Sequence, residues 1–205
     1  MTRVYFVRHA QPEHDWEEDR TRPLTEEGKK DSAIVLEFLK DKKIDAFYCS
    51  PYKRSMDTIT EAADFFTKEI ITDERLRERE KGLDGNNHGM FRKRWADHNY
   101  HEEGGESIAM VQKRNIEALN EILSDNTDKD IVIGTHGTAL STILNFYDNN
   151  FGCEDFLRII DRMPYIIELD FESSCNEMES ECPSYSFKLI GKQEHCYIEK
   201  EFKGK

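Results

Sequence analysis

Val4-Tyr5-Phe6-Val7-Arg8-His9 is the stretch from which the fold can be worked out. Its four apolar residues are β-branched or aromatic and are bounded by charge, a pattern typical of a strand buried in a sheet. Ile131-Val132-Ile133-Gly134-Thr135 has the same character, and His136-Gly137 follows it at once. Both stretches therefore predict a buried strand that delivers a histidine at its carboxyl end.

Helical and strand patterns alternate along the rest of the chain. Thr25 is predicted to cap a helix that runs to about Lys40, because acidic residues fill its first turn. Strands alternating with helices predict an α/β protein with a mainly parallel sheet covered by helices on both faces. The other expected elements are strands at Ala46–Cys49 and Ile70–Ile71, helices at about 54–68, 108–126 and 139–146, and a late edge hairpin at Tyr165–Phe171 and Ser186–Ile190.

One segment, at about 80–105, interrupts this alternation. It is polar and rich in Gly, Asn, His and Arg, with Phe91 and Trp95 at helical spacing. We interpret it as an insertion with one short helix that lies over a site. The 205 residues are thus predicted to form a single domain, 1–205, with a small cap-like insertion. The later stretch Glu172–Pro183 is predicted to be an acidic surface loop.

The charge balance excludes several classes of partner. Lys and Arg number 29 against 42 Asp and Glu, which gives a net charge of −13. Such a chain repels nucleic acid and anionic membrane surfaces, so neither is expected as a partner. No apolar run reaches membrane-spanning length, and the N-terminus lacks the apolar region of a secretory signal. A cytosolic location is the resulting expectation.

The five cysteines form no CxxC pair, and their odd number favours reduced thiols. A metal site built from Cys175, Cys182, Cys196 and His195 is the alternative, but these spacings match no zinc ribbon or finger. We therefore expect no metal.

Unusual polar residues follow three predicted strands. They are Arg8-His9, Ser50 to Arg54, and His136-Gly137. Parallel strands place ligand sites outside their carboxyl ends, so these residues are expected to converge on one pocket. Forked guanidinium groups bind phosphoryl oxygens and an imidazole can attack phosphorus, which makes this a predicted phosphoryl site. Taken singly, each residue has a simpler interpretation as a solvated residue at a strand end.

At this point the sequence resembles the histidine phosphatase superfamily, in its phosphoglycerate mutase-like branch. The resemblance runs from Val4 to about Phe146 and comprises six elements in the family's order. They are Val7-Arg8-His9-Ala10-Gln11, Arg22-Pro23-Leu24-Thr25-Glu26-Glu27-Gly28, Ser50 to Thr58, Leu76-Arg77-Glu78-Arg79-Glu80-Lys81-Gly82, Gly104-Gly105-Glu106-Ser107 and Thr135-His136-Gly137.

The resemblance implies a metal-independent phosphomonoesterase that needs no cofactor. By matched position, His9 becomes phosphorylated, Arg8, Arg54 and His136 bind the phosphoryl oxygens, and Glu78 handles the leaving-group proton. Glu80 is the rival of Glu78 for that last role. The imidazole of His9 needs one unprotonated nitrogen facing phosphorus and a hydrogen bond that orients the other. Further substrate contacts are expected from Gln11, Gly137 and Thr138.

Three positions depart from the family pattern. Ala10 replaces the usual Gly and requires a right-handed or extended backbone. Asp15 stands near a position where an oxygen-binding Asn is common, and a carboxylate there would repel phosphate. Thr138 replaces the Asn usual in mutases, and the chain is shorter than cofactor-dependent mutases. Both of these features favour a phosphatase.

Two other functions are left open by the sequence. One is a cofactor-dependent phosphoglycerate mutase, and the other is a catalytically weak binding or scaffold protein of the same fold. The expected ligand is a small phosphorylated molecule. The basic residues Arg92, Lys93, Arg94, His98 and His101 either contact a second anionic group of that molecule or form a solvated helix face.

Overall fold

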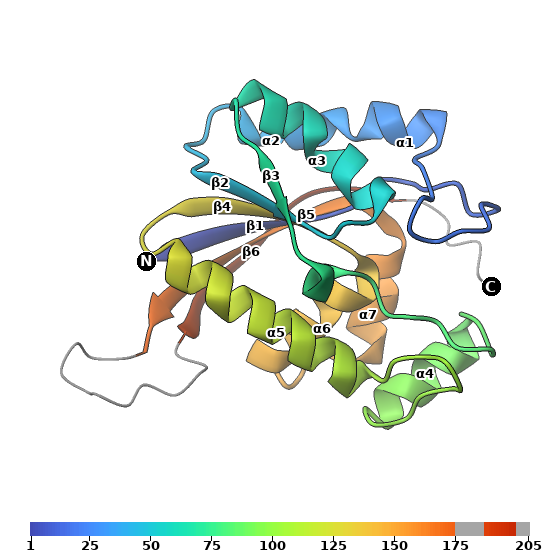
Figure 1. Cartoon of the computed structure of the whole chain (residues 1–205). Helices are drawn as coiled ribbons and strands as arrows, with labels where there is room; N and C mark the ends of the chain where they lie inside the picture. The colour runs from blue at the N-terminus through green and yellow to red at the C-terminus, as the bar shows by residue number, and fades with distance from the viewer. Residues whose placement is uncertain (175–186, 200–205) are drawn as a thin grey trace.

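A six-stranded sheet with the order β3-β2-β4-β1-β5-β6 forms the centre of the computed structural model, which describes residues 1–174 and 187–199 (Figure 1). β1 pairs in parallel with β4, β4 with β2, and β2 with β3, whereas β5 is antiparallel to β1 and β6. The predicted mainly parallel sheet is thus confirmed. The strands are β1 (Thr2–Arg8), β2 (Ala46–Cys49), β3 (Ile70–Thr72), β4 (Asp130–Thr135), β5 (Arg162–Ser173) and β6 (Phe187–Glu199).

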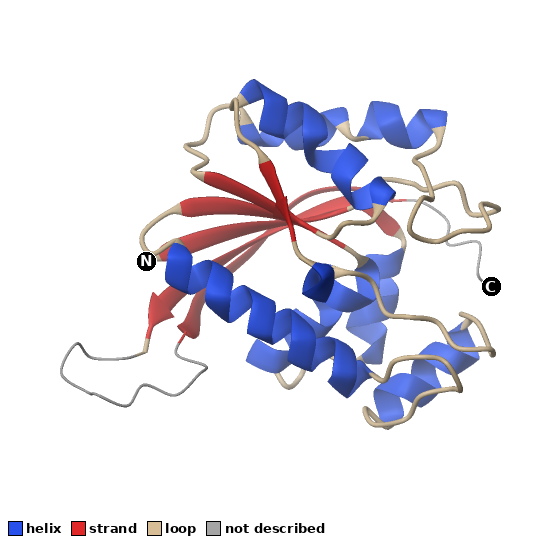
Figure 2. Cartoon of the chain, in the orientation of Figure 1, coloured by secondary structure: helices blue, strands red, loops and turns tan. Residues whose placement is uncertain are grey.

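Helices cover both faces of the sheet, as expected. Figure 2 shows α1, α2 and α3 on one side and α5, α6 and α7 on the other. In residues 1–174 and 187–199, no helix has the length and apolarity that spanning a membrane requires. The helices are α1 (Glu26–Asp31), α2 (Ala33–Leu39), α3 (Lys53–Phe65), α4 (His88–Ala96), α5 (Ile108–Asp125), α6 (Gly137–Tyr147) and α7 (Cys153–Ile160), and a 3-10 turn, η1, spans Glu74–Leu76.

The central strand β1 divides the core in two. Successive side chains of a strand point to opposite faces, so Val4 and Phe6 join one apolar cluster and Tyr5 and Val7 join the other. The first cluster contains side chains from α5, α6 and α7, and the second contains side chains from α2 and α3. This arrangement explains why β1 is a continuous apolar run and not an alternating one.

The single helix predicted at 25–40 is wrong, because Ser32 separates α1 from α2. Its start is as expected: Thr25 caps α1, and the Gly28 N–H donates to the Thr25 hydroxyl at 2.8 Å. At Ser32 the hydroxyl donates to the carbonyl of Lys29 at 2.7 Å, a local bond that competes with the regular helical ladder.

The later elements extend the sequence-based expectations. The short helix expected around Phe91 and Trp95 is α4. The patterns above do not predict α7, although Phe156 and Ile159 form a buried helical stripe there and Asp155 accepts the Gly152 N–H at 3.0 Å. Both signals are readable in the sequence.

The late hairpin is present, but its strands β5 and β6 are longer than predicted. β6 lies at the edge of the sheet, where one side of a strand faces solvent and polar residues are tolerated. A hydrophobic pattern therefore underestimates its length. Of the predicted acidic loop, 172–173 belong to β5 and 175–183 lie outside the described residues.

Gly28 lets α1 pass close to the chain that follows β1. A Cβ at Gly28 would lie 2.2 Å from the carbonyl oxygen of Gln11, which is closer than side-chain atoms approach a backbone oxygen. Gly28→Ala is expected to lower the free energy of unfolding by about 1–3 kcal/mol through overpacking, as measured by urea denaturation. Gly89→Ala, in the exposed first turn of α4, is the control and should change this free energy by less than about 1 kcal/mol. Equal effects of the two substitutions would contradict the close approach.

Candidate active site

Three strand ends meet at one edge of the sheet. His9 follows β1, Ser50 follows β2 and His136 follows β4, and these strands are adjacent in the order β2-β4-β1. Since parallel strands end at the same edge, the residues that follow them are brought together. The imidazole rings of His9 and His136 have centroids 5.2 Å apart.

A cavity of about 390 Å³ lies at this edge. Cationic side chains outnumber carboxylates in its walls, although the whole protein has a net charge of −13. Of the residues expected at the site, Arg8, His9, Arg54 and Glu78 line it. The complete lining is Arg8, His9, Pro12, His14, Asp15, Asp19, Arg22, Arg54, Glu78, Arg79, Lys81, Gly85, Asn86 and Met163.

His9 is buried and oriented by its neighbour in the chain. Its Nδ1 lies 2.8 Å from the carbonyl oxygen of Ala10. A carbonyl can only accept a hydrogen bond, so Nδ1 carries the proton and Nε2 keeps its lone pair. Burial, reinforced by the positive charges of Arg54 and Arg8, places the pKa of His9 well below its ordinary value. The ring is therefore a neutral imidazole at neutral pH.

Ala10 holds this arrangement without backbone strain. Its N–H donates to the Thr58 hydroxyl on α3 at 2.9 Å. Among the described residues, the non-glycine positions with positive φ are Thr67 and Asp128, so Ala10 adopts an ordinary backbone conformation. The absence of glycine at this position therefore leaves the local geometry intact.

Arg8 enters the cavity from the end of β1 and is almost fully buried. Its Nη1 donates to the carbonyls of Ile159 and Arg162, the latter at 2.9 Å. Its Nε has no hydrogen-bond partner among the described residues. Burial lowers the pKa of Arg8 to about 10, so the side chain remains a cation at neutral pH with donor capacity to spare.

Arg54, in the first turn of α3, is held by Asp19. Nη1 donates to the Asp19 backbone carbonyl at 2.7 Å and to its Oδ1 at 3.3 Å. Asp19 also pairs with Arg22, at 3.0 Å between Oδ1 and Nη1. Burial lowers the pKa of Arg54, opposed by the charge of Asp19. Asp19 belongs to an acidic run with Glu17 and Glu18, and nothing in the sequence distinguishes it from them.

His136 is fully buried behind the cavity lining. Its Nε2 lies 2.7 Å from the Ser50 hydroxyl, and its Nδ1 has no partner among the described residues. Burial, followed by the charge of Arg54, places the pKa of His136 well below its ordinary value. His136 is thus a second neutral imidazole, with one ring nitrogen fixed by Ser50.

Glu78 reaches the cavity from the irregular chain that follows η1. Its Oε1 accepts the Arg79 N–H at 2.7 Å, and its Oε2 accepts the Thr138 N–H at 3.0 Å. Glu80, the rival acid, is exposed and is not among the lining residues. The geometry favours Glu78 over Glu80 for proton transfer.

The remaining expected contacts lie elsewhere. Gln11 does not line the cavity, and its side-chain oxygen accepts a hydrogen bond from Thr25 at 3.0 Å. Gly137 and Thr138 lie at the start of α6, outside the lining, and the Thr138 N–H is used by Glu78. Gly137 instead gives room to a guanidinium, since a Cβ there would lie 3.4 Å from Nε of Arg8.

Five basic residues of the insertion lie outside the cavity lining, namely Arg92, Lys93, Arg94, His98 and His101. Arg92 pairs with Glu154 on α7, Arg94 is buried against Glu102, and Lys93 lies over the Tyr100 ring. The lining from this segment consists of Lys81, Gly85 and Asn86. His98 stacks edge-on against Trp95, and His101 contacts the Glu102 carbonyl.

Two other sequence-based questions concern carboxylates and metals. Asp15 is exposed and lines the cavity, so a carboxylate does stand at its edge. In the described part of the chain, no group of three His, Cys, Asp or Glu is arranged to hold a metal ion. Cys175 and Cys182 of the alternative site lie outside the described residues, and the His195 ring pairs with Glu168 at 2.7 Å.

The sequence matches a known protein family and several known proteins. Residues 4–179 match the model of the histidine phosphatase superfamily, branch 1. Phosphoserine phosphatase 1 of Hydrogenobacter thermophilus is 29% identical over 154 residues, which are 66% of this chain and 71% of that protein. A 2,3-bisphosphoglycerate-dependent phosphoglycerate mutase of Thermoplasma acidophilum is 44% identical over 55 residues, 27% of this chain and 28% of that protein.

Among solved structures, a phosphoserine phosphatase variant from Entamoeba histolytica in complex with phosphoserine superposes with a TM-score of 0.71. It is 20% identical, and the match covers 94% of this chain and 96% of that one. This likeness shows the fold. Because the family match extends over most of the chain, the protein belongs to branch 1 of the histidine phosphatase superfamily and is a phosphoric monoester hydrolase.

Proposed function

We propose that this hydrolase moves the phosphoryl group of a small phosphate monoester first to Nε2 of His9 and then to water, without a metal ion. The observation that carries the proposal is the state of His9. Its ring is neutral, its Nδ1 proton is held by the Ala10 carbonyl, and its lone pair lies on Nε2, in a cavity that Arg8 and Arg54 also line. A nucleophile for phosphorus needs these properties.

The two steps balance through Glu78. In the first, Nε2 of His9 forms a bond to phosphorus, the ester P–O bond breaks, and Glu78 gives its proton to the departing oxygen. In the second, the Glu78 carboxylate takes a proton from water, the water oxygen bonds to phosphorus, and the P–N bond returns its electrons to His9. The contact of Glu78 with the cavity supports this role.

Positive charge stabilises both transition states. Arg8 and Arg54 supply guanidinium donors in the lining of the cavity, and an incoming phosphoryl group competes with Asp19 for Arg54. If the Ser50 hydroxyl donates to Nε2 of His136, the proton of that ring lies on Nδ1, where it can donate to a phosphoryl oxygen.

Lys81 suggests the class of substrate. It lines the cavity and has no hydrogen bond or ion pair among the described residues, unlike the arginines around it. We infer that Lys81 contacts a second anionic group, such as a carboxylate, on the phosphate monoester. Segment 80–105 would then act as the cap-like insertion expected from the sequence. The cytosolic location stays a prediction.

His9→Ala is expected to lower kcat at least about thousand-fold and to eliminate an acid-labile phosphohistidine trapped by rapid quench in the presence of EDTA. His98→Ala, which removes a histidine outside the cavity, should retain both activity and label. Label that survives in His9→Ala would contradict the nucleophile assignment, and dependence on added Mg²⁺ would contradict metal independence. Isomerisation of 3-phosphoglycerate faster than phosphate release would indicate a mutase.

Glu78→Gln should slow hydrolysis of alkyl phosphates by about 10²–10⁴-fold, because their alkoxides need a proton to leave. With p-nitrophenyl phosphate the first step should be nearly unchanged, so stopped-flow should record a nitrophenol burst followed by slow turnover. Glu80→Gln is the matched control and should behave as the unsubstituted enzyme. The acid assignment would be wrong if Glu80→Gln gave the selective loss and Glu78→Gln did not.

Lys81→Ala is expected to raise KM about tenfold for phosphoserine and 3-phosphoglycerate, which carry a carboxylate. KM for p-nitrophenyl phosphate should be unchanged, because that substrate has no second anionic group. Lys93→Ala is the control, since Lys93 belongs to the same segment but lies over Tyr100. Equal changes in KM for all three substrates would argue against a specific contact.

A further inference from the structure

Glu78, the proposed acid, lies in a segment that has no regular secondary structure. Residues 77–80 belong to no helix or strand and run as a loop between η1 and α4 (Figure 2). Proton transfer to a leaving group needs the carboxyl placed within hydrogen-bond reach, and a displacement of about 1 Å can cost about 10²-fold in rate. Something outside this loop must therefore fix Glu78.

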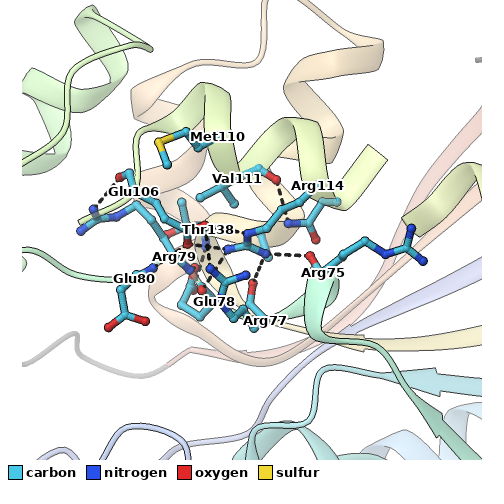
Figure 3. Close-up of polar contacts among 12 residues, drawn as sticks. Arg75, Arg77, Glu78, Arg79, Glu80, Glu106, Met110, Val111, Arg114 and Thr138 are labelled. Atoms are coloured by element: carbon cyan, nitrogen blue, oxygen red, sulfur yellow. Dashed lines mark hydrogen bonds and ion pairs between the residues drawn. The ribbon is translucent and has the colours of Figure 1, made fainter. Parts of the chain in front are cut away.

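The side chain of Arg114, on α5, is hydrogen-bonded to backbone carbonyls of this loop and of the turn before it (Figure 3). Its Nη1 donates to the carbonyls of Arg75 and Arg77, each at 2.7 Å, and its Nη2 donates to the carbonyl of Glu78 at 3.1 Å. One guanidinium thus binds three carbonyls along the chain that leads to the acid. Only the planar fork of an arginine provides this many donors in fixed directions.

Glu106, which directly precedes the N-cap residue of α5, binds both Arg114 and the same loop. Its two carboxylate oxygens accept from Nε and Nη2 of Arg114 at 2.9 and 2.8 Å. They also accept from Nη2 of Arg77 at 2.8 Å and from the Glu80 N–H at 2.9 Å. The Glu106 backbone bonds to the carbonyl of Glu80, and its own carbonyl accepts from Arg79. Each residue of 77–80 is therefore bound to Glu106 or Arg114.

Arg114 and Glu106 form an ion pair that stays charged at neutral pH and is little screened by solvent. The side chains of Arg114 and Glu106 are 12% and 10% exposed, so solvent screens them little. Burial opposes ionisation of Glu106, but hydrogen bonds from Arg114 and the Glu80 N–H outweigh it and lower the pKa of Glu106. The carboxylate is thus ionised wherever the enzyme meets neutral pH.

The same helix is also tied to the helix that begins at the site. Nε2 of Gln112 on α5 donates to the Thr142 carbonyl and to Oδ1 of Asn145 on α6, at 3.0 and 2.9 Å. α6 starts after His136, and its Thr138 N–H holds the Glu78 carboxylate. Arg114 of α5 therefore binds the backbone carbonyl of Glu78, and the Thr138 N–H of α6 binds its carboxylate. Hydrogen bonds from Gln112 join the two helices to each other.

We propose that Arg114 and Glu106 form a positioning pair that sets the place of the Glu78 carboxyl relative to the phosphorylated ring. Neither side chain lines the cavity, so the pair acts through Glu78 and not on the substrate. The inference rests on the proposed function, because it takes Glu78 as the acid. Under this inference, the Gly104–Ser107 element begins α5 and also positions the acid through Glu106.

The test measures kcat and KM of the Arg114→Gln and Arg75→Gln enzymes with two substrates. One is phosphoserine, an alkyl phosphate, and the other is p-nitrophenyl phosphate, an aryl phosphate. Arg75 is the matched control. It joins η1, the turn just before this loop, to the same helix through Glu121, at 2.6 Å, but its side chain has no hydrogen bond or ion pair with 77–80 among the described residues. Both changes are also made in the Glu78→Gln enzyme, and thermal unfolding is recorded for every variant.

Arg114→Gln is expected to lower kcat for phosphoserine about 10- to 100-fold with KM within about twofold, and to leave the nitrophenol burst nearly unchanged. In the Glu78→Gln background the same change should cost less than about threefold, because the group it positions is gone. Arg114→Lys, which keeps the charge but not the fork, should give an intermediate loss. Arg75→Gln should lower stability without this selectivity.

Three results would overturn the inference. Equal losses on the two substrates would assign Arg114 a structural role, as would an equal loss in the Glu78→Gln background. If Glu78→Gln alone showed no leaving-group selectivity, the acid assignment and this inference would fall together. Glu106→Gln is the second variant if Arg114→Gln does not fold, since an amide of the same size still accepts the Glu80 N–H. It should show the same selectivity at smaller magnitude, and its absence would count against the pair.

Discussion

β1 is buried on both of its faces, and the other layers of the molecule are arranged around it. Val4 to Val7 are almost fully buried, so apolar cover is needed above and below the strand. α2 and α3 supply it on one face and α5, α6 and α7 on the other, which makes three layers (Figure 1). The last residue of β1 and the residue that follows it then emerge at the edge of the sheet between two layers of helices. His9 and Arg8 are placed there by the strand itself.

Placing cations in a buried pocket has an electrostatic cost, and the structure offsets it locally. Burial is the largest cause of the lowered pKa values of both Arg8 and Arg54. Two carbonyls accept from Arg8, and Asp19 accepts from Arg54, which compensates part of the lost hydration. Burial, together with the same positive charges, keeps His9 neutral. The positive charges therefore attract an anion and also help burial to keep the nucleophile unprotonated.

Much of the fold and site follows from local patterns. Apolar runs ending in Arg8-His9 and His136-Gly137 predict the strands, and the strand-helix alternation predicts their parallel arrangement. The cap at Thr25 was readable because its hydrogen bond spans three residues. The break at Ser32 was not predicted, because serine occurs both inside helices and at their ends. α7 was missed although its stripe of Phe156, Ile159 and Ile160 has the helical period.

The residue types of the site, and the strand ends that carry them, follow from the amino-acid sequence, because they depend on short-range order and on a fixed rule of parallel sheets. Contacts between residues far apart in the chain depend on how the chain folds in three dimensions. Asp19 is one acid among several until α3 brings Arg54 to it, and Arg114 is one helix residue among many until its guanidinium meets the carbonyls before Glu78. Basic residues such as Arg94 have the composition of a binding site, but Glu102 neutralises Arg94 away from the cavity. The physical reason is that a hydrogen bond or ion pair depends on distances of about 3 Å, which the spacing of residues along a chain does not specify.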